Sequence, residues 1–217
     1  MQRLVAEALG SALLLAAVVG SGIMGERLAA GNVGIALLAN TAATGAMLYV
    51  LITAIGPVSG AHFNPAVTLV AAINGSLSWR LCTAYVAAQV AGAVLGVWIA
   101  HLMFELPIFQ LSTKARSGEA QLFSEFVATF GLLVTIIATV RFAPARVAPA
   151  VASYIVAAYW FTASTSFANP AVTVARSLSD TFAGIDAKAA PGFIAAQLLG
   201  AVAAMLAMSW LLKPRSP

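Results

Sequence analysis

The segment His-Phe-Asn-Pro-Ala-Val-Thr at 62–68 returns in the second half of the chain as Phe-Ala-Asn-Pro-Ala-Val-Thr at 167–173. In each copy the asparagine suits a helix N-cap and the proline suits the first helical position. The apolar stretches that follow, 67–71 and 172–175, are too short to cross a bilayer, which takes about 20 residues. Broken helices inside a membrane are tolerated only where they line a cavity or are buried in protein. The two motifs therefore predict a pore built around Asn64, Pro65, Ala66, Asn169, Pro170 and Ala171.

The composition of the whole chain is that of a polytopic membrane protein. Of its 217 residues, 61% are hydrophobic and only 8% are charged, which is too little charge for a soluble domain of this size. The net charge of +4 comes from single basic residues at the ends of apolar runs, so we expect contact with the lipid bilayer and no binding of nucleic acid. The expected fold is an all-α membrane protein with two half-membrane re-entrant helices and six transmembrane helices, near Leu4–Met24, Val33–Gly56, Trp79–Phe104, Gln121–Arg141, Val147–Ser164 and Gly192–Leu212.

The two halves of the chain form an internal repeat. Residues 7–15, which begin with Glu7, match 125–133, which begin with Glu125, and the segment around Gln89 matches the segment around Gln197. Together with the Asn-Pro-Ala motifs, these matches give each half the order span, span, short helix, span. Three spans is an odd number, so the second half must be inverted, and the two short helices meet cap to cap near the bilayer centre. We expect one channel domain over 1–217, with repeats of about 1–104 and 119–213.

The distribution of basic residues predicts the orientation. Six lie on one side, in loops without Asp or Glu, and these are Arg3, Arg80, Arg141, Arg146, Lys213 and Arg215. Four lie on the other side together with acidic residues, and these are Arg27, Lys114, Arg116 and Lys188. The positive-inside rule then places both termini in the cytoplasm of a multi-pass protein of the inner cell membrane.

The two caps carry the expected chemistry of the pore. When the side-chain oxygen of Asn64 or Asn169 accepts a hydrogen bond from the first turn of its helix, the amide NH₂ group is held as a donor facing the lumen. That donor would bind the oxygen of a passing neutral molecule. The positive ends of both short helices point at the same place, which forms a barrier to cations and to hydronium.

Glu7 and Glu125 are ionisable groups inside membrane spans, so each needs a reason to be there. One reading is proton coupling, as in a secondary transporter. The other is structural: each carboxylate accepts hydrogen bonds from the loop that leads into a short helix, which leaves no buried donor unpaired. The repeat symmetry favours the structural reading. We expect His62 to line the cytoplasmic mouth of the pore and His101 to lie at the membrane interface.

The segment 59–68, Ser-Gly-Ala-His-Phe-Asn-Pro-Ala-Val-Thr, the second Asn-Pro-Ala motif and the paired glutamates and glutamines resemble the aquaporin (major intrinsic protein) family over essentially the whole chain. The resemblance implies the inverted-repeat aquaporin fold, a homotetramer with one pore in each protomer, and passive transport. It implies no catalytic residue, no metal and no cofactor.

One position departs from the family pattern. Family members usually carry an arginine directly after the second Asn-Pro-Ala, where it forms the narrow selectivity filter, but this chain has Val172. By the family's spacing, the other filter positions are Thr44, Ala157 and Ser166. A ring without arginine, histidine or aromatic residues predicts a wide pore. Arg176 follows one helical turn later, about 6 Å farther along the axis, and is a candidate for the pore mouth.

The resemblance therefore implies a channel for small uncharged solutes that carry hydroxyl groups, such as glycerol, urea, boric acid and arsenous acid. An Arg-free filter is similar to that of a divergent bacterial branch of aquaporins associated with arsenic detoxification. The alternatives are a water-selective aquaporin, an inverted-repeat secondary transporter with a coupling-ion site, and an intramembrane enzyme. The sequence contains no Gly-x-Ser-x-Gly, His-Glu-x-x-His or multi-Cys pattern of such an enzyme.

Overall fold

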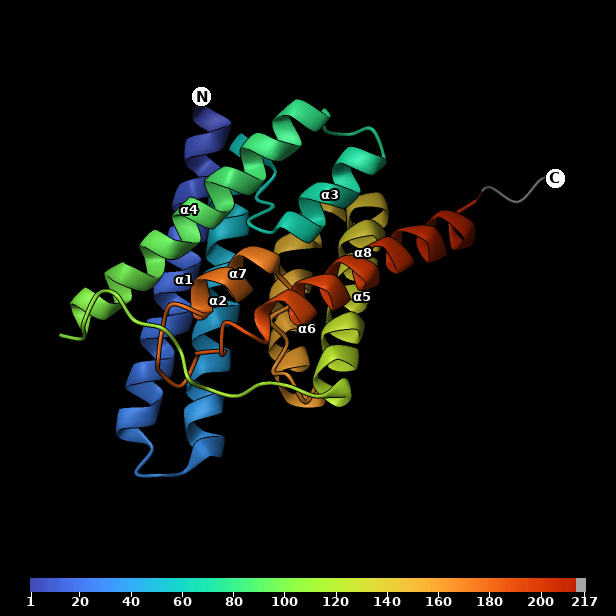
Figure 1. The fold of residues 1–217 in the computed structure, drawn as a ribbon. Coiled ribbons are helices and arrows are strands. Elements are labelled where there is room, and N and C mark those ends of the chain that lie inside the picture. Colours follow the sequence, from blue (N-terminus) through green and yellow to red (C-terminus); the bar gives the residue numbers. More distant parts are fainter. Residues whose placement is uncertain (214–217) are drawn as a thin grey trace.

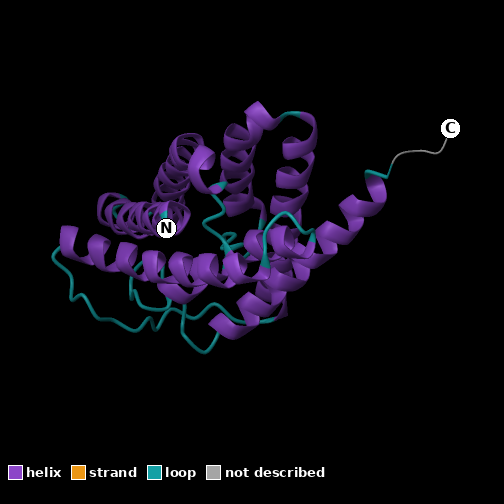
Figure 2. Cartoon of the chain, turned by 90° about the horizontal axis from the view of Figure 1, so that it is seen from above, coloured by secondary structure: helices purple, strands orange, loops and turns teal. Residues whose placement is uncertain are grey.

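The computed structural model describes residues 1–213, in which helices are joined by loops without any strand (Figure 2). The helices, labelled in Figure 1, are α1 (Gln2–Leu28), α2 (Val33–Ser59), α3 (Pro65–Ile73), α4 (Trp79–Met103), α5 (Glu119–Phe142), α6 (Val147–Phe161), α7 (Pro170–Arg176) and α8 (Ala190–Leu211). A short 3₁₀ turn, η1 (Pro144–Arg146), leads into α6. Each half of the chain thus supplies three long helices and one short helix in the same order, and the all-α fold class is confirmed.

Five of the helices are long and apolar enough to cross a membrane, and they are α1, α2, α4, α5 and α8. The sixth expected span, α6, has 15 residues and covers only about 22 Å. It ends at Phe161 and not at Ser164, because the chain bends at Thr162, which has extended backbone angles, into the loop toward α7. The first two spans extend farther than expected at their C-terminal ends. Helix α1 continues past Glu26 and Arg27 to Leu28, and α2 continues through Pro57. Arg215 lies outside the described residues.

Glycines bring the long helices of each half together in pairs. Helix α1 packs on α4, and α5 packs on α8. A Cβ atom at Gly92 would overlap the carbonyl oxygen of Ala8, and one at Gly200 would overlap that of Phe126. These backbones can approach each other only without a side chain at those positions, which is the usual way for membrane helices to pack closely.

The two short helices lie inside the bundle. Helix α3 packs against α4 and α8, and α7 packs against the same two helices, so both lie between the long helices (Figure 1). The loop from Phe104 to Gly118 crosses the end of the bundle opposite to the N-terminus (Figure 1). There it meets the segment that follows α7, since the Ser112 N–H donates to the Ser177 carbonyl at 2.9 Å.

Candidate pore and selectivity filter

The two asparagine caps hold the short helices together by reciprocal hydrogen bonds. In each, the side-chain oxygen accepts from the backbone N–H two residues on, at 2.9 Å. The Asn64 Nδ2 donates across to the Ala168 carbonyl, and the Asn169 Nδ2 donates across to the Phe63 carbonyl, both at 2.8 Å. An amide nitrogen has two hydrogens, so one hydrogen on each asparagine remains for a solute in the lumen.

Glu7 stabilises the loop that leads into α3. Its carboxylate is fully buried and accepts four hydrogen bonds, from Ser59 Oγ at 2.6 Å, His62 N at 3.0 Å, Phe63 N at 2.7 Å and Gln89 Nε2 at 2.8 Å. Without the carboxylate, two backbone N–H groups and two side chains would lose an acceptor in a buried place.

Glu125 does the same for the loop that leads into α7. It accepts from the Phe167 and Ala168 N–H groups, both at 2.9 Å, and from Gln197 Nε2 at 2.6 Å. Neither glutamate lines the cavity described below. This geometry matches the structural reading of the two carboxylates, whereas proton coupling would place a carboxylate on the transport path.

The loops before the two caps share a repeated backbone conformation. Ala61 and Phe63 have φ angles of 49° and 48°, and Ser166 and Ala168 both have 49°. These residues stand three and one positions before each asparagine, in the left-handed region that non-glycine residues rarely adopt. With these backbone angles, N–H groups of each loop point toward its glutamate. The carbonyls of Phe63 and Ala168 point toward the asparagine of the opposite cap. The hydrogen bonds to the glutamates hold this costly conformation.

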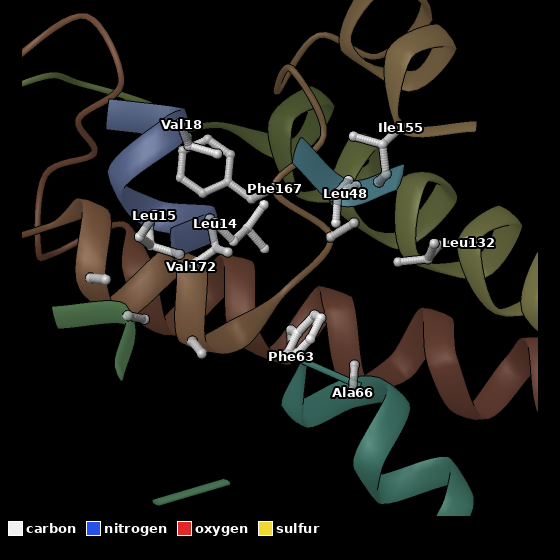
Figure 3. Packing of buried hydrophobic residues seen from close by; sticks show 14 of the residues in the cluster. Leu14, Leu15, Val18, Leu48, Phe63, Ala66, Leu132, Ile155, Phe167 and Val172 are labelled. Atoms are coloured by element: carbon white, nitrogen blue, oxygen red, sulfur yellow. The ribbon is translucent and has the colours of Figure 1, made fainter. Parts of the chain in front are cut away.

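A cavity of about 400 Å³ runs past both caps. On one side it is lined by the cap loops and α7, and on the other by apolar residues of α2, α5 and α6, such as Leu48, Leu132 and Ile155 (Figure 3). Near α7 its polar lining residues are Tyr159, Ser166 and Arg176, and near the ends of α3 and α5 they are Asn74, Ser76 and Arg141. Among residues 1–213, no Asp or Glu lines it.

Three of the four expected filter residues line this cavity, and one does not. Thr44, Ser166 and Val172 are lining residues, whereas Ala157 is exposed on the opposite face of α6. The expectation for Ala157 is wrong, because the inward face of α6 is formed by residues four apart, among them Ile155 and Tyr159. The Tyr159 hydroxyl lies 3.4 Å from Thr44 Oγ1. The cavity therefore contains, beside Thr44, an aromatic residue that the family's spacing missed and that helical periodicity pointed to.

Substitutions at Tyr159 and at Ala157 should have very different effects on the rate of solute entry. Truncation in Tyr159→Ala removes the ring opposite Thr44, so we expect faster entry of polyols larger than glycerol, such as erythritol, by at least about threefold, a barrier change near 0.7 kcal/mol. Ala157→Leu adds bulk on the outer face and should leave erythritol entry unchanged. Swelling of proteoliposomes in erythritol measures both. A slower rate in Ala157→Leu together with no change in Tyr159→Ala would contradict the placement.

Arg176 reaches the cavity although it lies at the end of α7. Its side chain is almost fully buried, its Nε donates to the Ala183 carbonyl, and its guanidinium carbon lies 3.4 Å from the centroid of the Phe167 ring. Arg116, from the long loop, lies over the same ring at 5.2 Å. The sequence offered no signal for this position of Arg116, which depends on how the loop folds back over the bundle.

The two histidines occupy different environments. His62 lines the cavity, with its Nδ1 at 3.1 Å from Thr68 Oγ1. His101 was expected at the membrane interface but is fully buried. Its ring nitrogens each lie 2.9 Å from an oxygen atom, one of Ile108 in the long loop and one of Ser179 after α7. His101 therefore connects two loops.

Comparisons with known proteins agree with this architecture. Residues 1–146 match the family model of the major intrinsic protein. The chain is 60% identical over 216 residues to the aquaglyceroporin AqpS of Rhizobium meliloti (strain 1021), covering 100% of this chain and 92% of that protein. It is 42% identical over 94 residues to aquaporin NIP1-1 of Oryza sativa subsp. japonica, covering 42% of this chain and 33% of that protein.

A solved structure supports the fold as well. The X-ray structure of the aquaglyceroporin from Plasmodium falciparum superposes with a TM-score of 0.77, covering 98% of this chain and 97% of that chain, at 18% sequence identity. The repeated caps, the buried glutamates and these matches together show that the chain belongs to the major intrinsic protein family.

Proposed function

We propose that this protein is a passive membrane channel for small uncharged solutes with several hydroxyl groups, including glycerol and metalloid hydroxides such as arsenous acid. The observation that carries the proposal is the cavity of about 400 Å³ that passes both asparagine caps without a lining carboxylate. A relative that is 60% identical is called an aquaglyceroporin, which supports glycerol as one of the solutes.

The two sides of the cavity suit such solutes. One remaining amide hydrogen on each of Asn64 and Asn169 binds a hydroxyl oxygen, while most of the opposite wall of α5 and α6, such as Leu132 and Ile155, is apolar. A polyol can place its hydroxyls on the first wall and its carbon chain on the second. Arsenous acid is neutral at pH 7 and has the shape of a small polyol, so it meets the same donors.

The same cap region rejects cations. The N-termini of α3 and α7 meet at the caps, where each helix contributes partial positive charge. A cation at this point loses its water and meets no carboxylate among the lining residues. Neutral solutes lose only hydrogen bonds to water, which the caps replace.

The proposal also covers the domain organisation, the membrane orientation and the oligomeric state of the protein. We propose one channel domain over 1–217 with inverted repeats, a location in the inner cell membrane with both termini in the cytoplasm, and a homotetramer. In support, Arg3, Arg80 and Arg141 all lie at helix ends, and large apolar side chains such as Leu95 and Leu199 are exposed on the long helices, where they can meet lipid or a neighbouring protomer.

Stopped-flow light scattering on reconstituted liposomes tests the function. We expect glycerol and arsenous acid to enter much faster than in protein-free liposomes, at a rate that does not depend on a proton or sodium gradient. Fast water flux without solute flux would instead identify a water-selective aquaporin. A rate that rises with an imposed ion gradient would identify a coupled transporter.

A further inference from the structure

The ring of Phe63 lies in a notch of α1 that is open only because residue 10 is a glycine. A Cβ atom at Gly10 would stand 2.0 Å from Cε1 of this ring, 2.4 Å from Cζ and 2.6 Å from Cδ1. Carbon atoms that are not bonded to each other pack best at about 3.5–4.0 Å. The Phe63 side chain is buried, with 2% of its surface exposed. The ring therefore occupies the volume that any other residue at position 10 would fill.

The backbone of Phe63 is fixed on both sides of this ring. Its N–H donates to the carboxylate of Glu7 at 2.7 Å, and its carbonyl accepts from Asn169 Nδ2 at 2.8 Å. Glu7 stands three residues before Gly10, so the two positions lie on the same face of α1. One turn of α1 thus holds the backbone of Phe63 through Glu7 and its ring through Gly10.

A ring that is forced out of the notch affects the path of the solute. Phe63 belongs to the buried core and also lines the cavity, so the open space beside it is the lumen itself. A ring that turns into this space narrows the lumen. A shift of the backbone instead removes the carbonyl that holds the amide of Asn169, and the second hydrogen of that amide is the donor for the solute. Both displacements hinder passage at the caps.

The second half of the chain carries a different pair at the equivalent positions. In the internal repeat, Gly10 corresponds to Ala128 and Phe63 corresponds to Ala168. Both alanines are fully buried, and the Ala168 carbonyl accepts from Asn64 Nδ2 at the same distance of 2.8 Å. A larger residue on the long helix is thus combined with a smaller one before the cap. The two sizes change together, which indicates that they have to match.

From these observations we propose that Gly10 and Phe63 form a size-matched pair that positions the Asn169 cap, which makes Gly10 a positioning residue for solute passage. The glycine admits the ring, the ring fixes the loop against α1, and the Phe63 carbonyl keeps the amide of Asn169 in place. Gly10 itself is not a lining residue of the cavity. The inference rests on the proposed channel function, because solute flux is its readout.

Gly10→Ala tests the pair in proteoliposomes, where stopped-flow light scattering gives the glycerol and water permeability per incorporated protein. We expect the glycerol permeability to fall at least about fivefold. The water permeability should fall less, because a smaller solute depends less on the width of the lumen. Gly10→Ala/Phe63→Ala should bring the glycerol permeability back to within about twofold of the wild type, since neighbouring substitutions that relieve a clash are not additive. This variant carries the same two residues as the second half.

Gly22→Ala is the matched control. Gly22 is also buried on α1, but a Cβ atom there would meet its nearest neighbour at 3.5 Å, an ordinary contact, so this variant should keep the wild-type permeability. A Gly10→Ala protein that unfolds at a lower temperature but keeps the wild-type ratio of glycerol to water permeability would show a packing role alone and overturn the proposal. A double variant that is no more permeable to glycerol than Gly10→Ala would also overturn it.

If Gly10→Ala does not fold, Phe63→Ala and the double variant decide the question. The added methyl group then fills space that the ring has left, so the double variant should be at least as permeable to glycerol as Phe63→Ala, and a lower permeability would contradict the pairing. The wild type tests the channel function separately. In a wild type that passes only water, the same fall and recovery would be read from the water permeability.

Discussion

Val172→Arg is expected to lower the flux of glycerol through the reconstituted channel at least about tenfold. This corresponds to an increase of about 1.4 kcal/mol in the free-energy barrier to permeation. Val172 lines the cavity and is 6% exposed, so a longer side chain has to extend into the lumen. Arg176 stands one turn later on α7 and lines the same cavity, and two like charges in a narrow region repel each other. The flux of water should fall much less, because water is smaller. Stopped-flow light scattering measures both solutes in the same liposomes.

Val172→Thr is the matched control for this substitution. Threonine has nearly the volume of valine, so glycerol flux should stay close to that of the wild type. Wild-type glycerol flux in a Val172→Arg protein that elutes normally on size exclusion would show that Val172 does not limit the pore.

Glu7→Gln should produce the second large effect, on stability. The carboxylate of Glu7 accepts four hydrogen bonds, whereas a glutamine turns an NH₂ group toward some of the same donors. Each buried donor that loses its acceptor costs about 1–3 kcal/mol. We expect the midpoint of thermal unfolding in detergent to fall by at least about 5 °C, as followed by tryptophan fluorescence.

Glu26→Gln provides the comparison, since Glu26 lies on the same helix but is exposed, and it should unfold at the wild-type temperature. Glu125→Gln should resemble Glu7→Gln, because Glu125 accepts from two backbone N–H groups and a glutamine in the other half. A Glu7→Gln protein as stable as Glu26→Gln would mean that the loop before α3 does not depend on the carboxylate.

Local chemistry was enough to predict most of the architecture. The spans follow from runs of apolar residues, and the start of each short helix follows from the cap preference of asparagine and the fixed φ of proline. The inverted arrangement follows from the repeat and an odd number of spans. The pairing of Glu7 and Glu125 with the loops was also within reach, because a buried carboxylate needs donors and both halves of the repeat carry backbone N–H groups in the loop before the cap.

The direction of the side chains near the expected filter could be determined only from the tertiary structure. Ala157 and Tyr159 are two residues apart, about 200° around the helix. The family's spacing therefore named a residue on the outer face of α6, whereas the packing of α6 turns Tyr159 toward the cavity. Arg176 is similar, because its guanidinium is placed by Phe167 and by the Ala183 carbonyl in a later loop. Hydrophobicity and caps act within a few residues, whereas helix rotation and the course of a long side chain depend on contacts between segments far apart in the chain.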